Sequence, residues 1–133
     1  MTACFADTFC FLAMMNPRDE DHERVTAFMS AFVRPLVTTA WVLTEVGDAL
    51  ADTPNRPIFT RFLSQLRSDS RSLVVPTSDN LFEEGVELYH ERPDKEWSLT
   101  DCISFVVMQQ QGLSEALTKD HHFEQAGFVA LLK

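Results

Sequence analysis

Four acidic residues, Asp7, Glu45, Asp101 and Asp120, are of the type and in the sequence context that could bind a divalent cation. Asp7 interrupts the apolar stretch CFADTFC (residues 4–10), and a charged carboxylate buried there is costly unless it is neutralised, hydrogen-bonded or bound to a metal. Oxygen ligands suit Mg²⁺ and Mn²⁺, whereas Zn²⁺ prefers His and Cys. Carboxylates that converge repel one another, and a divalent cation removes that conflict. We therefore take these residues as candidate metal ligands.

The elements that must position them alternate along the chain. Short apolar or β-branched runs predict strands at residues 3–7, 36–39, 72–75, 116–118 and 128–131, with helical patterns between them. Such βα units favour an α/β fold with a mostly parallel sheet and helices on both faces. Asp19 is expected to cap the second helix, and Ser78 or Asp79 a later one. No repeat or long linker divides the chain, so one domain over residues 1–133 is expected.

This architecture gives the acidic residues a common place. In open parallel sheets, ligands bind beyond the carboxyl ends of the strands, where the strand order reverses. Asp7 ends the first expected strand and Asp120 follows the fourth, so both point into one crevice if these strands are neighbours. Glu45 and Asp101 lie in the first turns of helices that follow extended stretches, at the same rim.

Each acidic residue also has a purely structural interpretation. Asp101 can favour a helix N-terminus through the helix dipole, and Asp120 can cap the short helix that follows it. Glu45 can be a solvated helix residue, as Asp48 on the same helix is expected to be.

Composition narrows the class of protein. The net charge of −9 argues against a generic nucleic-acid coat, because phosphate binding depends on Lys and Arg. The charge is uneven: residues 54–75 carry +3 and residues 79–101 carry −6, which predicts a bipolar surface if the two segments lie on separate faces.

Three cysteines without CxxC spacing indicate free thiols in a reducing cytosol. The N-terminus lacks a secretory pattern, and no run reaches membrane-spanning length.

A resemblance to PIN-domain ribonucleases, most closely the VapC-type toxins of bacterial toxin–antitoxin pairs, is carried by four stretches. They are DKEWSLTDCISFVVM (residues 94–108), LTKDHHFEQAGF (residues 117–128), ADT (residues 6–8) and LTE (residues 43–45). The resemblance covers essentially the whole chain. It implies a three-layer α/β/α sandwich, a Mg²⁺- or Mn²⁺-dependent endoribonuclease activity on single-stranded or looped RNA, and a cytoplasmic location without membrane contact. It also implies a cognate antitoxin and a homodimer.

The same resemblance implies roles for particular residues. Asp7, Glu45, Asp101 and Asp120 match the acidic metal-binding quartet of the family. We expect Asp7 and Asp101 to be the principal ligands, and Glu45 and Asp120 to hold metal-bound waters or a second ion. Thr8 and Thr118 match supporting hydroxyl positions, where they can orient those waters. The arginine-bearing segment (residues 54–75) is either a solvated face or a surface that steers RNA or holds an acidic partner segment.

Three other functions fit the residues less well. A non-catalytic PIN-fold interaction module would be signalled by lost ligands, and a stand-alone PIN nuclease by the absence of a neighbouring antitoxin gene. A phosphohydrolase with Asp7 as nucleophile would need a second Asp two residues on, where this chain has Phe9. His121 and His122 invite a catalytic base or a zinc site, but local packing or capping at a helix start is the expected role.

Overall fold

The computed structural model describes all residues from 1 to 133, and its centre is a five-stranded sheet in which every strand pair is parallel. The strand order is β3-β2-β1-β4-β5. The strands are β1 (Cys4–Ala6), β2 (Leu36–Thr39), β3 (Ser72–Val75), β4 (Glu115–Leu117) and β5 (Val129–Ala130). The second and third strands match the predicted ranges residue for residue, whereas β1 and β5 are shorter than predicted at both ends and β4 begins and ends one residue earlier.

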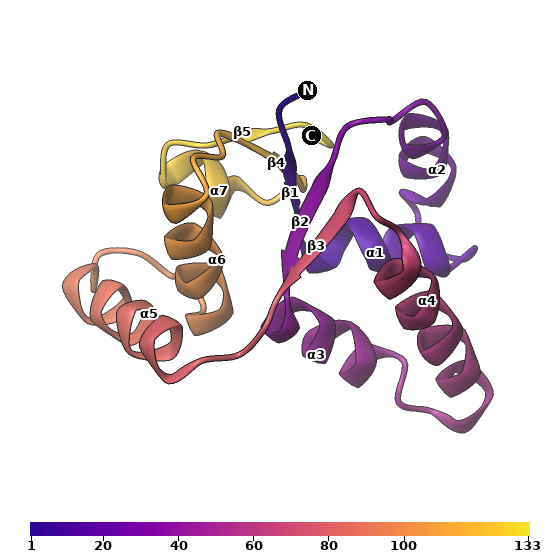
Figure 1. Ribbon diagram of the computed structural model, residues 1–133, viewed down its shortest axis with the longest axis horizontal. Coiled ribbons are helices and arrows are strands. Elements are labelled where there is room, and N and C mark those ends of the chain that lie inside the picture. The colour runs from indigo at the N-terminus through magenta and orange to yellow at the C-terminus, as the bar shows by residue number, and fades with distance from the viewer.

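Seven α-helices and one 3-10 turn (Thr53–Asn55) connect and cover the strands. The helices are α1 (Thr8–Met15), α2 (His22–Ser30), α3 (Ala40–Ala49), α4 (Arg56–Ser68), α5 (Asp79–Glu91), α6 (Leu99–Gln110) and α7 (His121–Gln125). Figure 1 shows α1, α2 and α4 on one side of the sheet and α5, α6 and α7 on the other. The α3 helix contacts both α1 and α6 near the carboxyl end of β2. The predicted sandwich with helices on both faces is confirmed.

The capping predictions have mixed outcomes. Ser78 caps α5 as expected, because its hydroxyl accepts a hydrogen bond from the backbone N–H of Leu81 at 3.2 Å. The prediction for Asp19 is wrong: α2 begins at His22, and the Asp19 carboxylate instead accepts from the backbone N–H of Asp21 in the preceding turn. A turn at residues 16–21 delays the helix, and aspartate side chains readily bond the backbone two residues on in such turns.

The strand order reverses at the central strand β1. Phe5 pairs with Val37 of β2 on one side and with Ala116 of β4 on the other. The chain therefore proceeds from β1 to one half of the sheet and returns to fill the other half. The crevice expected at such a reversal lies beyond the carboxyl ends of β1 and β4, and the neighbour relation required for Asp7 and Asp120 to share it is confirmed.

Aromatic packing holds α6 and α7 against this crevice. The rings of Phe105 on α6 and Phe123 on α7 meet edge to face, with centroids 4.9 Å apart, and both side chains are almost fully buried. Trp97, just before α6, packs against Phe105 at 5.0 Å. The N-termini of both helices are thereby fixed relative to the sheet.

No helix in the structure is long and apolar enough to cross a membrane.

Candidate active site

Asp7 is a buried carboxylate at the carboxyl end of the central strand. It occupies the N-cap position of α1, yet its side chain makes no capping hydrogen bond, and only 8% of the residue is exposed. Its Oδ2 instead accepts a hydrogen bond from the Thr118 hydroxyl at 3.0 Å. The same hydroxyl oxygen accepts from the backbone N–H of Asp120 at 3.0 Å. Thr118 therefore connects Asp7 directly to Asp120.

The protonation of Asp7 is strongly perturbed. Burial raises the pKa of Asp7 from its ordinary value near 3.8 to about 7, and the charges of Asp101 and Asp120 add to this rise. Hydrogen bonds from the backbone of Thr8 and from the Thr118 side chain lower the pKa but do not outweigh burial. Without a compensating cation, the raised pKa favours the protonated form of Asp7 far more than in an exposed aspartate.

Glu45 is directed toward the same place by α3. This helix starts immediately after β2, and the Thr39 hydroxyl caps it by accepting from the backbone N–H of Val42 at 3.1 Å. Further along the helix, Glu45 Oε1 accepts a hydrogen bond from the Thr8 hydroxyl at 2.6 Å. Asp48, on the same helix, is exposed, as predicted for a surface residue.

Asp101 serves two local roles at the N-terminus of α6. Ser98 is the N-cap, its hydroxyl accepts from the backbone N–H of Asp101 at 3.0 Å, and Asp101 Oδ2 accepts from the backbone N–H of Ser98 at 3.1 Å. This reciprocal capping box holds the carboxylate in one orientation. His122 Nδ1 lies 3.1 Å from the same Oδ2 atom. The structural interpretation of Asp101 is therefore correct, and it coexists with a place in the crevice.

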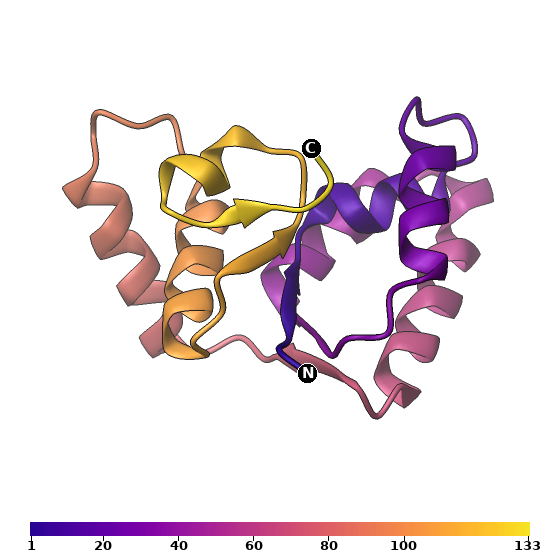
Figure 2. The same cartoon turned by 90° about the horizontal axis from the view of Figure 1, so that it is seen from above.

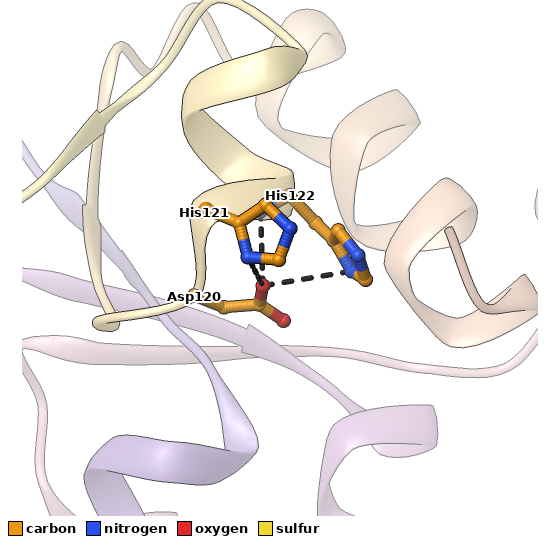
Figure 3. Close-up of side chains that lie close together, drawn as sticks. All are labelled: Asp120, His121 and His122. Carbon is orange, nitrogen blue, oxygen red and sulfur yellow. Dashed lines mark hydrogen bonds and ion pairs between the residues drawn. The ribbon is translucent and has the colours of Figure 1, made fainter. Parts of the chain in front are cut away.

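Asp120 starts α7 as its N-cap, with Oδ1 accepting from the backbone N–H of His122 at 2.9 Å. Figure 3 shows the rings of His121 and His122 beside this carboxylate. Their Nδ1 atoms lie 3.6 Å and 3.5 Å from Asp120 Oδ1. A ligand atom from each of these three residues falls within 4.8 Å of the others, but the residues are consecutive and His121 is 71% exposed. Their proximity follows from their adjacency at the helix start.

The role expected for His122 needs correction. Local capping or packing was predicted, but its ring reaches across 21 residues of sequence to Asp101 and lies between two carboxylates. The supporting hydroxyls also differ in detail from the expectation, since Thr8 and Thr118 bond to Glu45 and Asp7 themselves. They orient the carboxylates directly.

All four predicted carboxylates line one hollow of about 630 Å³. Thr8, predicted as a supporting residue, also lines the hollow. The other lining residues were not assigned to the site from the sequence: Phe9, Glu96, Ser98, Lys119, His121 and His122. No Lys or Arg forms an ion pair with any of the four carboxylates. Lys119 is engaged elsewhere: its Nζ lies 2.6 Å from Asp21 Oδ2 and 3.6 Å from Glu20 Oε1.

This donor set fits a hard divalent cation. The four predicted carboxylates and Glu96 line the hollow, no Lys or Arg pairs with any of the four, and burial raises the pKa of Asp7, the most buried of them. An oxygen-rich, negatively charged site of this kind suits Mg²⁺ or Mn²⁺ better than Zn²⁺.

The fold and the site define a PIN domain. The model of the PIN domain family matches residues 4–129, and the chain belongs to this family. Among curated proteins, it is similar to the 23S rRNA-specific endonuclease VapC20 of Mycobacterium tuberculosis, with 28% identity over 128 residues that cover 94% of this chain and 95% of the relative.

Solved structures agree with this assignment. The crystal structure of Mycobacterium tuberculosis VapC20, described as a toxin that cleaves the sarcin-ricin loop, superimposes with a TM-score of 0.87 at 25% identity and covers 98% of each chain. The structure of FitAcB from Neisseria gonorrhoeae has a TM-score of 0.67 at 18% identity, covering 97% of this chain and 95% of that one, and supports the fold.

Proposed function

We propose that this protein is a Mg²⁺- or Mn²⁺-dependent endoribonuclease that hydrolyses phosphodiester bonds in single-stranded or looped RNA. The observation that carries the proposal is the set of four carboxylates in one hollow at the β1–β4 reversal, without a Lys or Arg partner, in a member of the PIN family. The activity of VapC20 on 23S rRNA supports RNA as the substrate class, and a ribosomal RNA loop is the first substrate to test.

The chain supplies the geometry for this chemistry. Asp7 and Asp101 are the principal ligands of the ion, with Glu45 and Asp120 completing the site. The chemistry supplied there by a bound divalent cation is a lower pKa of the attacking water and compensation of negative charge on the scissile phosphate. Thr8 holds the Glu45 carboxylate, Thr118 holds Asp7, and the capping box holds Asp101, so each ligand is oriented before substrate arrives.

His122 has a positioning role in this proposal. Its ring contacts the carboxylates of Asp101 and Asp120, which come from different helices. It therefore limits how far these two carboxylates separate when no cation is bound.

The test is cleavage of a ribosomal RNA hairpin by Asp101→Asn, with Asp48→Asn as the matched control. Asparagine in place of Asp101 keeps an oxygen for the capping bond but loses the charge, so we expect cleavage to be abolished. Asp48 lies on α3 outside the hollow, and its variant should cut at the normal rate. Normal cleavage by Asp101→Asn, or cleavage by the wild type in the presence of EDTA, would refute the mechanism.

We further infer that the protein is the cytoplasmic toxin of a toxin–antitoxin pair and acts as a homodimer. The similarity to VapC20 over nearly the full length of both chains supports the toxin role. Induced expression should arrest growth, and coexpression of a small adjacent gene encoding a DNA-binding protein should restore it. The absence of such a gene would favour the stand-alone nuclease. Sedimentation of the purified chain tests the dimer.

A non-catalytic interaction module is disfavoured by the retention of all four carboxylates in the hollow. A phosphohydrolase is disfavoured by Phe9, whose ring lines the hollow at the position where a second Asp would be needed.

A further inference from the structure

A second and larger cavity, of about 860 Å³, adjoins the carboxylate hollow. The last turn of α5, the loop of residues 92–98 and the start of α6 line it. Glu96 and Ser98 line both cavities, so a ligand seated in one can extend into the other along these two residues. Figure 2 shows the loop between α5 and α6 at the end of the molecule toward which β1 and β4 run.

The charge of this second cavity differs from that of its surroundings. Two cations, Arg92 and Lys95, and one acid, Glu96, line it, although residues 79–101 carry a net charge of −6. Arg92 is paired with Asp94, which leaves Lys95 as the unpaired cation of the wall. Lys95 forms no ion pair in the structure and lies partly buried in the wall. An ammonium group without a carboxylate partner, beside a centre that would cut a phosphodiester, is suited to contact a neighbouring phosphate.

The cavity also offers flat surfaces. The Tyr89 side chain is part of the wall, the residue is 55% exposed, and its hydroxyl makes no hydrogen bond. The Arg92 guanidinium lies over the Trp97 ring at 5.1 Å from its centroid, and Asp94 holds it through bonds of 3.0 Å and 2.9 Å. Exposed aromatic rings and arginine planes are the surfaces on which unpaired bases stack.

We propose that this cavity is a nucleotide subsite, in which an unpaired RNA nucleotide flanking the scissile bond stacks its base on Tyr89 and places its phosphate at Lys95. This inference rests on the proposed RNA substrate and specifies how that substrate is held. The subsite would also help an acidic protein to bind RNA, because it presents the unpaired ammonium group of Lys95 next to the reacting phosphate. An acidic peptide is the alternative occupant, but its carboxylates would not stack on the exposed Tyr89 ring.

The test uses Tyr89→Ala and Lys95→Gln with two matched controls. Phe82→Ala removes another ring from α5 that is 42% exposed and outside the cavity, and Arg18→Gln removes one exposed positive charge from the turn before α2, outside both cavities. The probe is an RNA hairpin with an unpaired loop. Its binding is measured by fluorescence anisotropy in the Asp101→Asn background, and its cleavage kinetics in the otherwise wild-type protein.

Each cavity variant should weaken RNA binding and raise KM about tenfold, with kcat nearly unchanged, whereas the controls bind and cut normally. Lys95→Gln should also lower the slope of log affinity against log salt by about 0.7, and Tyr89→Ala should leave it unchanged. Tyr89→Phe keeps the ring and should restore binding, which separates stacking from a folding defect.

The outcomes distinguish this inference from the proposed function. If RNA is cut but the cavity variants match the controls, or if Arg18→Gln weakens binding as much as Lys95→Gln, the subsite is overturned and the nuclease stands. If no protein cuts RNA but the cavity variants still lose affinity, the nuclease fails and the subsite stands. Lys95-dependent binding of an oligoglutamate peptide in preference to the hairpin would overturn RNA as the occupant.

Discussion

At the scale of single residues, Asp7 is the carboxylate whose negative charge is least favourable in the metal-free protein. It is the most buried of the four carboxylates, and only neutral hydrogen-bond donors face it directly. Its neighbours Asp101 and Asp120 make ionisation harder. The side chain is thus poorly suited to stabilise the metal-free fold and well suited to bind a cation, as in sites where function is retained at a cost in stability.

The raised pKa of Asp7 predicts how stability depends on pH in the metal-free protein. Between the pKa of the unfolded chain, near 3.8, and the folded pKa of about 7, the folded state binds more protons, so the free energy of unfolding falls as pH rises through this window. In Asp7→Asn this residue no longer ionises, so its contribution to the fall in the free energy of unfolding disappears. The advantage of the variant over the wild type should grow by about 4 kcal/mol between pH 4 and pH 8.

Urea unfolding in EDTA at several pH values measures this difference. Asp48→Asn, at an exposed position on α3, is the control and should show no such growth. A constant difference between Asp7→Asn and the wild type would mean that Asp7 is not buried uncompensated.

At the scale of elements, helix N-termini place the candidate ligands. Asp120 caps α7, Asp101 belongs to the capping box of α6, and Thr39 caps the α3 helix that carries Glu45. A cap sets the direction in which a helix leaves its loop, and it therefore sets the direction of a side chain in the first turns. The stability of these helices and the geometry of the proposed metal site therefore depend on the same hydrogen bonds.

Two substitutions that each remove an N-cap hydroxyl should therefore have similar effects on stability but different effects on RNA cleavage. Ser98→Ala and Ser78→Ala each remove an N-cap hydroxyl, from α6 and α5 respectively, and each should lower the free energy of unfolding by about 1 kcal/mol. Only Ser98→Ala releases Asp101, so it alone should slow RNA cleavage. Chemical denaturation and cleavage assays on both variants provide the comparison. Equal activity of the two would show that the capping box does not position the ligand.

At the scale of the whole molecule, charge is distributed by the fold. Figure 1 shows the arginine-bearing α4 and the acidic α5 on opposite sides of the sheet, which is the arrangement that the predicted bipolar surface requires. The carboxylate hollow lies beyond the carboxyl ends of β1 and β4. Because its ligands come from α3, α6 and the starts of α1 and α7, binding of a cation should stabilise the fold as a unit.

A melting experiment tests this coupling. Mn²⁺ at 100 times its dissociation constant should stabilise the protein by about 2.7 kcal/mol and raise Tm by about 10 °C. Asp101→Asn should lose most of the shift, and NaCl at equal ionic strength should not produce it. We infer that residues 1–133 form one domain, so the curve should contain a single transition. A Tm insensitive to millimolar Mn²⁺ would contradict the metal site.

Much of the fold follows from local signals. The strands at residues 36–39 and 72–75 match the prediction residue for residue, because each is a short β-branched run with a proline, Pro35 or Pro76, at one end. Ser78, as one of two candidates with Asp79, and Asp120, in its structural interpretation, could be predicted as caps because a capping hydrogen bond spans only two or three residues. The failure at Asp19 has the same origin, since consecutive acidic residues offer several nearly equivalent cap positions.

By itself, the sequence predicted the alternating strands and helices and, through the motifs that resemble the PIN family, the four candidate ligands. Spacing alone would not have singled these four out, because an acidic chain of this length contains many Asp and Glu residues. Only the tertiary structure decided which groups meet. The bond from Thr118 to Asp7 spans 111 residues, and the contact of His122 with Asp101 and the cavity beside Tyr89 and Lys95 depend on how distant elements pack. Periodicity and capping act over a few residues, whereas a hydrogen bond between distant side chains forms only after strand order and helix packing have brought them together.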